Sequence, residues 1–255
     1  MNNTDLHCHS NFSDGILSPR ELVRRAKEKG VLNLALTDHN SVEGVKEAIE
    51  EGGKIGVNII PAVEMKFRGG EILGYFVDFE NTSFKNFLDK LQKASLETTK
   101  EIYQKFNSKG YLFSFEEIRK SFPNSKNNLS WYNLCYFLLF RGFRKSLKEI
   151  VQFFFEETLF SPQKKTYSPE EIIKQIRDVG GVPVLAHPWI TRTSKNLLNE
   201  PKINSLINAG LRGVEIDQGD RNGKRTGEFL DKIMAISEKY NLIITSGSDN
   251  QIVFF

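Results

Sequence analysis

The order in which strand-like and helix-like segments follow one another restricts the fold of this chain more than any other feature. Short apolar segments typical of buried strands occur on both sides of a long helical stretch. They lie at residues 3–7, 31–37, 57–63, 72–77, 182–186, 212–216 and 242–246. Helical patterns separate most of these segments, and such alternation indicates an α/β fold. Seven predicted strands favour a parallel (β/α) barrel over an open sheet.

Capping residues mark where the predicted helices begin and end. Ser18 and Pro19 open a helix that ends near Gly30, because serine caps free backbone N–H groups and proline tolerates the first helical position. A second helix is expected over residues 41–51, with Ser41 as its N-cap and the two following glycines as its end. These signals support the helix–strand alternation.

Residues 81–165 differ in composition from the rest of the chain. This segment has helical periodicity and holds 15 Lys and Arg against 8 Asp and Glu, a net charge of +7. It also contains 13 of the 20 phenylalanines. We therefore expect a helical insertion domain at 81–165, within a discontinuous barrel domain formed by residues 1–80 and 166–255. The charge has two interpretations, a solvated basic face or a basic wall facing an anionic substrate.

The overall composition excludes several classes of protein. No run of about 18 apolar residues is present, so we expect no transmembrane helix. The first residues, MNNTDLHCHS, lack the basic and apolar regions of a signal peptide. The two cysteines, Cys8 and Cys135, cannot form a disulfide framework, and we expect a reduced, cytoplasmic setting. A net charge of +3 is too small to indicate nucleic-acid binding by itself.

All four histidines of the chain lie at or just after the end of a predicted strand. They are His7, His9, His39 and His187. Carboxylates occur near strand ends as well: Asp5, Asp14, Asp38, Glu64 and Asp249. The C-terminal ends of the strands form the active-site face of a (β/α) barrel. Strand side chains alternate, so both imidazoles of the H-x-H pair point to the same side. Mixed imidazole and carboxylate shells suit Zn, Mn or Fe, and a metal site is therefore predicted on this face.

Five sequence strings carry these residues: DLHCHSNFSDG, LTDHN, PAVE, VLAHP and GSD. Together they resemble the PHP (polymerase and histidinol phosphatase) family, and most closely its stand-alone metal-dependent phosphoesterases. The resemblance covers the first 80 residues and the chain from about residue 166 onward. It implies an α/β fold that is a distorted (β/α)7 TIM-like barrel with a helical insertion, holding two or three divalent metal ions.

The resemblance also implies which residues hold the ions. His7, His9, Glu64 and Asp249 would hold the first ion. Glu64 would bridge to a second ion, which His187 would also bind. The identity of the metal stays open among Mn, Zn and Fe.

Asp14 and His39 would hold a third ion by the same resemblance. Family members hydrolyse phosphoesters, often those of nucleotides or short oligonucleotides. The expected activity is hydrolysis of such a phosphoester through a metal-activated water, with His187 and Asp14 as candidates for moving protons. The expected partner is a small phosphorylated substrate, and we predict no membrane and no protein partner.

The chain departs from the family pattern at three places where relatives carry a histidine. Glu71, in the string GEILGY, either replaces one histidine or adjoins a two-residue deletion. If it binds a metal, it is a harder ligand that favours Mn or Mg. Asn128 ends the string Lys126-Asn127-Asn128 where relatives read R-P-H, and Gln251 follows Asp249 where the third histidine is expected.

Lys126, Asn128 and Arg192 are the residues we expect at a substrate phosphate. Lys126 would act there as a point charge. The alternative for Lys126 and Arg192 is that they are solvated surface residues.

Two other functions stay open. The missing histidines, with a chain that stops at Phe255, earlier than most relatives, are compatible with a non-catalytic or degenerate member that binds a phosphate ligand. An amidohydrolase acting on C–N bonds also begins with H-x-H. Such enzymes typically use a lysine at a mid-barrel strand end, and Glu64 occupies the nearest such place here.

Overall fold

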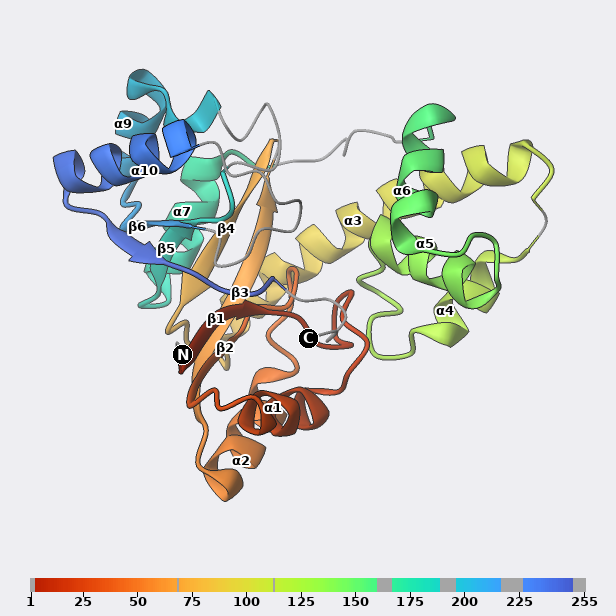
Figure 1. Ribbon diagram of the computed structural model, residues 1–255, viewed down its shortest axis with the longest axis horizontal. Helices are drawn as coiled ribbons and strands as arrows, with labels where there is room; N and C mark the ends of the chain where they lie inside the picture. Colours follow the sequence, from red (N-terminus) through yellow and green to blue (C-terminus); the bar gives the residue numbers. More distant parts are fainter. Residues whose placement is uncertain are drawn as a thin grey trace.

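The structure, a computed structural model, describes residues 3–67, 69–111, 113–159, 167–188, 196–216 and 227–249. Seven strands form one sheet in sequence order. They are β1 (Thr4–Cys8), β2 (Asn33–Leu36), β3 (Asn58–Phe67), β4 (Gly70–Tyr75), β5 (Val182–Leu185), β6 (Gly213–Glu215) and β7 (Ile243–Thr245). Figure 1 shows the sheet between two groups of helices, with α1 and α2 beside its first strands and α7, α9 and α10 beside its last.

One strand runs against the others, which corrects the expectation of a wholly parallel barrel. β1, β2 and β3 are parallel, and so are β5, β6 and β7, but β4 is antiparallel to both β3 and β5. β3 ends at Phe67 and β4 begins at Gly70. A connection this short can only turn the chain back, because a parallel crossover needs a dozen or more residues. The start of β4 therefore lies at the same end of the sheet as the C-terminal ends of the other strands.

The two edges of the sheet approach each other through backbone hydrogen bonds. Leu6 N donates to Ser246 O at 3.3 Å, and Asp249 N donates to His7 O at 2.7 Å. The segment that follows β7 thus lies along β1, as Figure 1 also shows. The sheet curls into a distorted, barrel-like shape, which confirms the predicted fold class.

Most predicted helices are present, and the first is capped as expected. Ser18 and Glu21 form a reciprocal capping box at the start of α1. The helices are α1 (Pro19–Glu28), α2 (Val45–Ile55), α3 (Thr82–Ser108), α4 (Phe115–Ser121), α5 (Trp131–Phe140), α6 (Leu147–Glu156), α7 (Pro169–Asp178), α9 (Glu200–Ala209) and α10 (Gly227–Tyr240), with a 3-10 turn, η1, at Asn196–Leu198. Among the helices of the described part, none is long and apolar enough to span a bilayer.

The second helix differs from its prediction at both ends. It begins after Gly44 and not at Ser41, and it continues through the glycine pair to Gly56. The residues before it are engaged elsewhere, since Asn40 N donates to Glu64 O at 2.8 Å. Gly52 lies inside α2, where the helix packs closely on β3. A Cβ at this position would lie 2.5 Å from Val57 O, so the packing requires a residue without a side chain.

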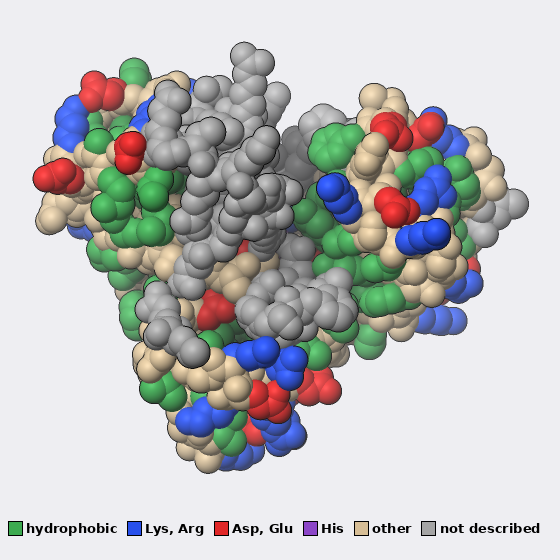
Figure 2. All heavy atoms as spheres, viewed as in Figure 1, with side chains coloured by type: hydrophobic (Ala, Val, Ile, Leu, Met, Phe, Trp, Pro, Cys, Tyr) green, Lys and Arg blue, Asp and Glu red, His purple; other side chains and the backbone are tan. Residues whose placement is uncertain are grey.

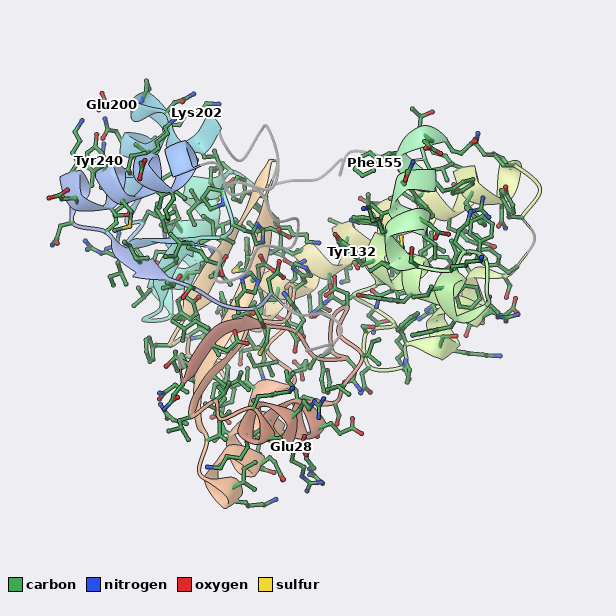
Figure 3. The ribbon with its side chains drawn as sticks, in the orientation of Figure 1. Glu28, Tyr132, Phe155, Glu200, Lys202 and Tyr240 are labelled. Carbon is green, nitrogen blue, oxygen red and sulfur yellow. The ribbon has the colours of Figure 1, made fainter. Side chains whose placement is uncertain are left out.

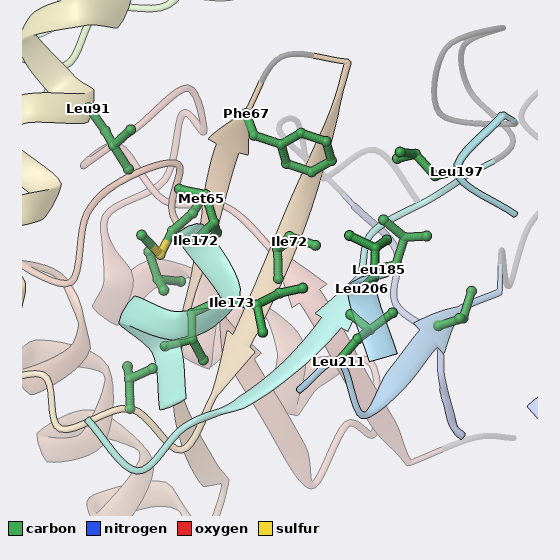
Figure 4. Packing of buried hydrophobic residues seen from close by; sticks show 14 of the residues in the cluster. Met65, Phe67, Ile72, Leu91, Ile172, Ile173, Leu185, Leu197, Leu206 and Leu211 are labelled. Carbon is green, nitrogen blue, oxygen red and sulfur yellow. The ribbon is translucent and has the colours of Figure 1, made fainter. Parts of the chain in front are cut away.

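Two main hydrophobic clusters divide the described chain. The first joins the outer face of β3 and β4 to α7, α9 and the start of α3, as the packing of Met65, Ile72 and Ile173 in Figure 4 shows. The second contains buried residues from 102 to 159 only, and holds α4, α5, α6 and the end of α3. Because α3 contributes to both, the boundary of an insertion at residue 81 stays a prediction.

Candidate metal centre

Side chains along β3 and β4 point alternately to the two faces of the sheet, one of which faces the hydrophobic core and the other the candidate site. Met65 pairs with Ile72 across the two strands, and both belong to the outer core. Their neighbours Glu64, Lys66 and Glu71 therefore point to the opposite, inner face. Because β4 is antiparallel, Glu71 reaches the same end of the sheet as the C-terminal ends of the parallel strands.

Glu64 lies at the centre of a buried cluster. Its Oε2 atom is 3.3 Å from His7 Nε2, 3.4 Å from His9 Nε2 and 2.9 Å from His39 Nδ1. Its Oε1 atom accepts a hydrogen bond from His187 Nε2 at 2.8 Å. The structure thus brings together all four histidines around one carboxylate that is wholly buried.

Two aspartates complete the cluster on its other sides. Asp249 Oδ1 is 3.3 Å from His9 Nε2 and 3.6 Å from His7 Nε2. Asp14 Oδ2 is 3.4 Å from His39 Nε2, and its Oδ1 atom is 3.9 Å from His9 Nδ1. Every residue for which metal binding is predicted therefore lies in this one place.

The chemistry of these atoms fits a divalent metal. Six of the buried side-chain atoms without a hydrogen-bond partner in the described chain belong to this cluster: His7 Nε2, His9 Nδ1 and Nε2, Asp14 Oδ1, His39 Nδ1 and Glu64 Oε2. An unpaired buried polar atom is costly unless another partner is present. Three sets of ligand atoms within 4.8 Å of one another could each hold an ion: His7, Glu64 and His187; His7, His9 and Asp249; and His9, His39 and Glu64. Imidazole and carboxylate donors of this kind suit Zn, Mn or Fe.

Glu71 reaches the edge of the cluster. Its Oε2 atom is 3.3 Å from His187 Nε2, and its Oε1 atom is 3.6 Å from His39 Nδ1. Of the two interpretations of the string GEILGY, this position favours Glu71 in the place of a histidine. Its role as a ligand stays a prediction.

Glu215 is a site residue that sequence reasoning missed. Its two carboxylate oxygens accept hydrogen bonds from His7 Nδ1 at 2.8 Å and from the backbone N–H of His187 at 2.9 Å. A carboxylate can only accept, so His7 Nδ1 carries a proton, and Nε2 is the nitrogen left for a metal once its own proton is displaced. The available signal was a glutamate inside the otherwise apolar strand RGVEI.

Two further aspartates hold the loops that carry the ligands. Asp38 accepts hydrogen bonds from Ser10 N at 2.7 Å, Ser10 Oγ at 2.6 Å and Ser13 Oγ at 2.6 Å. These bonds hold the loop that leads to Asp14. Asp5 accepts from Ser248 N at 2.9 Å and Ser248 Oγ at 2.6 Å, which holds the loop before Asp249.

The electrostatics of the cluster favour protonated imidazoles when no metal is bound. Burial by itself would lower the pKa of His187, but the hydrogen bond and charge of Glu64, with Glu71 and Asp249, raise that pKa to about 9. For His7, burial is likewise outweighed by Glu215, Glu64 and Asp249, which raise its pKa well above the usual value. A metal ion that binds here must displace these protons.

We call α4, α5, α6 and the end of α3, which share the second hydrophobic cluster, the helical module. This module touches the metal cluster through residues 128–133. Asn128 Nδ2 donates to His39 O at 2.5 Å, and Asn133 Nδ2 donates to Ser13 O at 3.0 Å. Ser130 Oγ donates to Asp14 Oδ2 at 3.3 Å. These contacts hold α5 against the loops that carry the predicted ligands.

The predicted phosphate-binding residues have different positions. The amide of Asn128 is used to hold backbone, while its Oδ1 atom is buried and has no partner among the described residues. Lys126 is exposed. Arg192 lies outside the described residues, as do Gln251 and Phe255. Their predicted roles stay predictions.

Tyr132 was also missed from the sequence. Its ring contacts that of Trp131, with centroids 4.0 Å apart and planes tilted by 32°, and it lies on the side of the module toward the sheet (Figure 3). Burial, together with the negative charges of Asp14, Asp249 and Glu71, raises the pKa of its hydroxyl. Tyr132 is therefore an aromatic neighbour of the metal cluster.

The basic charge of the module is spread over its surface and partly neutralised. Arg141 pairs with Glu117 at 2.7 Å, and Lys109 pairs with Glu157. Arg144 lies over the ring of Phe143, 4.3 Å from its centroid. Figure 2 shows Lys and Arg side chains interspersed with Asp and Glu on this part of the visible face. This distribution favours the solvated-face interpretation over a continuous basic wall.

Comparison with known proteins agrees with this geometry. Residues 5–159 match the family model of the PHP domain. A 3',5'-nucleoside bisphosphate phosphatase of Chromobacterium violaceum is 26% identical over 259 residues, covering 98% of this chain and 87% of the relative. A 5'-3' exoribonuclease of Escherichia coli is 28% identical over 263 residues, covering 96% and 84%. A crystal structure described as a metal-dependent phosphoesterase, from Bifidobacterium adolescentis, shares the fold, with a TM-score of 0.84 and 23% identity over 97% of this chain and 87% of that one.

Proposed function

This chain belongs to the PHP domain family and is, at the level of that family, a metal-dependent hydrolase of phosphoesters; we propose that its substrate is a nucleotide or a short oligonucleotide. The buried cluster around Glu64 carries the proposal. Imidazole and carboxylate atoms from distant parts of the sequence converge there without hydrogen-bond partners. Such an arrangement is costly to fold unless cations complete it.

The geometry supports a division of the ligands among more than one ion. His7, His9 and Asp249 would hold one ion, and Glu64 would bridge from it toward His187, with Glu71 at the edge. Divalent ions bound there would supply positive charge to phosphoryl oxygens and activate water for attack on phosphorus.

A third ion would be held by His39 and Asp14. The Ser130 hydroxyl donates to Asp14 and keeps that carboxylate aimed at His39. We propose that Asp14 and His187 also hold or move the protons of the reaction, since both lie inside the cluster.

The aromatic pair Trp131–Tyr132 supports a substrate that carries a base. Tyr132 lies near enough to the cluster for the charges of Asp14, Asp249 and Glu71 to act on its hydroxyl, and the Trp131 ring is in contact with it, tilted by 32°. Nucleobases stack on aromatic rings with about 1–3 kcal/mol each. The two relatives above are a nucleoside bisphosphate phosphatase and an exoribonuclease, whose substrates belong to the same class.

The test measures metal content and hydrolysis together. The chain is stripped of metal, reloaded with manganese, and assayed on a nucleoside monophosphate, a nucleoside bisphosphate and a short RNA. We expect at least two ions per chain and release of phosphate or nucleotides. His9→Ala and Asp249→Ala should lose both manganese and activity, whereas Asp178→Ala, an exposed residue far from the cluster, should keep both. Full activity in either of the first two variants would refute the metal assignment.

A second comparison tests the substrate class. Trp131→Ala should raise KM for the nucleotide but leave KM for p-nitrophenyl phosphate unchanged, and Trp131→Phe should restore most of the difference. An equal effect on both substrates would remove the argument for base stacking. A chain that binds manganese and inorganic phosphate but hydrolyses none of the substrates would be the non-catalytic alternative.

A further inference from the structure

Lys66 is a partly buried cation on the inner face of the sheet that the assignments above do not use. It follows Glu64 by two residues on β3, so both side chains point to the same face. Glu71 lies directly opposite Lys66 in the β3–β4 ladder. Lys66 Nζ is 3.4 Å from Glu71 Oε1.

The two oxygens of Glu71 have different neighbours. Oε1 faces the Lys66 ammonium, whereas Oε2 faces His187 Nε2 at 3.3 Å. Glu71 therefore links the cation to the metal cluster and fixes where the ammonium lies. A lysine alone would be free to take many rotamers, and ordering it in this way removes much of the entropy cost of a later contact.

Exposure identifies the open side of the cluster. The side chains of His7, His9, Glu64 and Asp14 are 0% exposed, whereas Lys66 and Glu71 are each 19% exposed and Asp249 is 15% exposed. A ligand that approaches from solvent therefore meets this rim before the buried imidazoles. Of the three rim side chains, Lys66 is the one that carries positive charge.

We propose that Lys66 contacts a phosphoryl oxygen of the substrate and that Glu71 is the residue that positions Lys66. This inference rests on the proposed function. The ammonium supplies a fixed positive charge at the rim, where an anionic phosphate loses part of its hydration. The competing explanation is a cross-strand ion pair that only stabilises the hairpin, which is worth about 0.2–1 kcal/mol. The phosphate contact requires that phosphate binding depend on the positive charge of Lys66, whereas a purely structural ion pair does not.

The test compares Lys66→Met, which keeps a side chain of similar length but removes the charge, with Lys66→Arg, which keeps the charge. Lys174→Met is the control, since Lys174 is an exposed lysine of α7 in an ion pair with Asp178. The metal-loaded proteins are titrated with inorganic phosphate by calorimetry, and manganese content and melting temperature are measured on the same samples.

We expect Lys66→Met to weaken phosphate binding by about 10- to 100-fold, as for the loss of a charged hydrogen bond. Lys66→Arg should recover part of the affinity, and Lys174→Met should match the unmodified chain. Manganese content should stay unchanged in all three variants. Glu71→Gln, compared at equal manganese content, should weaken phosphate binding less than Lys66→Met does, because it removes the partner that places the ammonium but keeps the ammonium itself.

Two results would overturn the assignment. Unchanged phosphate affinity in Lys66→Met, with or without a lower melting temperature, would leave only the structural ion pair. Loss of manganese in Lys66→Met would show that Lys66 supports the metal site and not the substrate. Because binding is measured without turnover, an unmodified chain that holds manganese and binds phosphate through Lys66 but hydrolyses nothing would refute the proposed function and keep this inference.

Discussion

Replacing Glu215 by glutamine should weaken metal binding, although Glu215 is not itself placed to bind an ion. One oxygen accepts from His7 Nδ1 at 2.8 Å and the other from His187 N at 2.9 Å. The first bond holds a proton on His7 Nδ1, so that Nε2, which faces Glu64 and Asp249, is the nitrogen whose proton a metal displaces. Glutamine has the same shape but exchanges one accepting oxygen for a donating amide group.

Either orientation of the new amide disrupts this arrangement. If its NH2 group faces His7, the Nδ1 atom must accept and the proton moves to Nε2, which then has no lone pair for a metal. If the NH2 group faces the backbone N–H of His187, two buried donors oppose each other, at a cost of about 1–3 kcal/mol. Residues that orient a metal ligand typically contribute about 10- to 100-fold in metal affinity. The expected loss is therefore about 1.4–2.8 kcal/mol of manganese binding free energy.

Calorimetric titration of metal-free protein with manganese measures this loss directly. Glu200→Gln is the matched control, because Glu200 is an exposed residue that pairs with Lys239 far from the cluster. Long-range nitrogen–proton NMR correlations on the metal-free chain, recorded above the pH at which His7 loses its second proton, report which nitrogen keeps the remaining proton. Unchanged manganese affinity in folded Glu215→Gln would refute the reasoning, and an unchanged tautomer with weaker binding would assign the effect to His187.

Two further predictions concern pH and packing. Because the pKa of His187 is raised to about 9, its contribution to the stability of the metal-free chain is complete below pH of about 6.5 and is lost as pH rises through about 9; manganese binding near pH 7 should release protons, and titrations in buffers of different ionisation enthalpy that show no release would contradict this. Gly52→Ala should destabilise the chain by about 1–3 kcal/mol in urea unfolding, because the new Cβ would lie 2.5 Å from Val57 O. Gly53→Ala is the control, with nothing within 4 Å of its Cβ, and should stabilise α2 by about 0.5–1 kcal/mol; equal effects of the two substitutions would refute the packing argument.

The positions of the donors could be predicted from local sequence. His7 and His9 point to the same side of their strand because strand side chains alternate. Glu64 and His187 each follow directly after an apolar run that was predicted as a strand and that forms part of β3 or β5. The C-terminal ends of parallel strands meet at one end of a sheet, so residues at such ends converge whatever the details of packing. For this reason the motif strings alone sufficed to identify the family and to gather the predicted ligands.

The direction of β4 was not predicted from the sequence. The two strands were expected at 57–63 and 72–77, which left a connection long enough for other arrangements. In the structure, pairing extends both strands toward each other, with Phe67 opposite Gly70. Strand ends depend on the partner that supplies the hydrogen bonds, and the sequence pattern does not contain that partner. The antiparallel turn is what brings Glu71 and Lys66 to the metal face.

The sequence by itself determined which donor types this chain has and to which side of each strand they point, because those properties follow from residue identity and strand periodicity. Only the tertiary structure decided which other side chains hydrogen-bond to these donors or to the loops that carry them. Glu215 meets His7 across 208 residues, and Asp5 meets Ser248 across 243. Such pairs depend on how far the sheet curls and on the register of its edges, which are set by the packing of the whole chain. The candidate metal ligands could therefore be predicted from the sequence, while the residues that orient them could not.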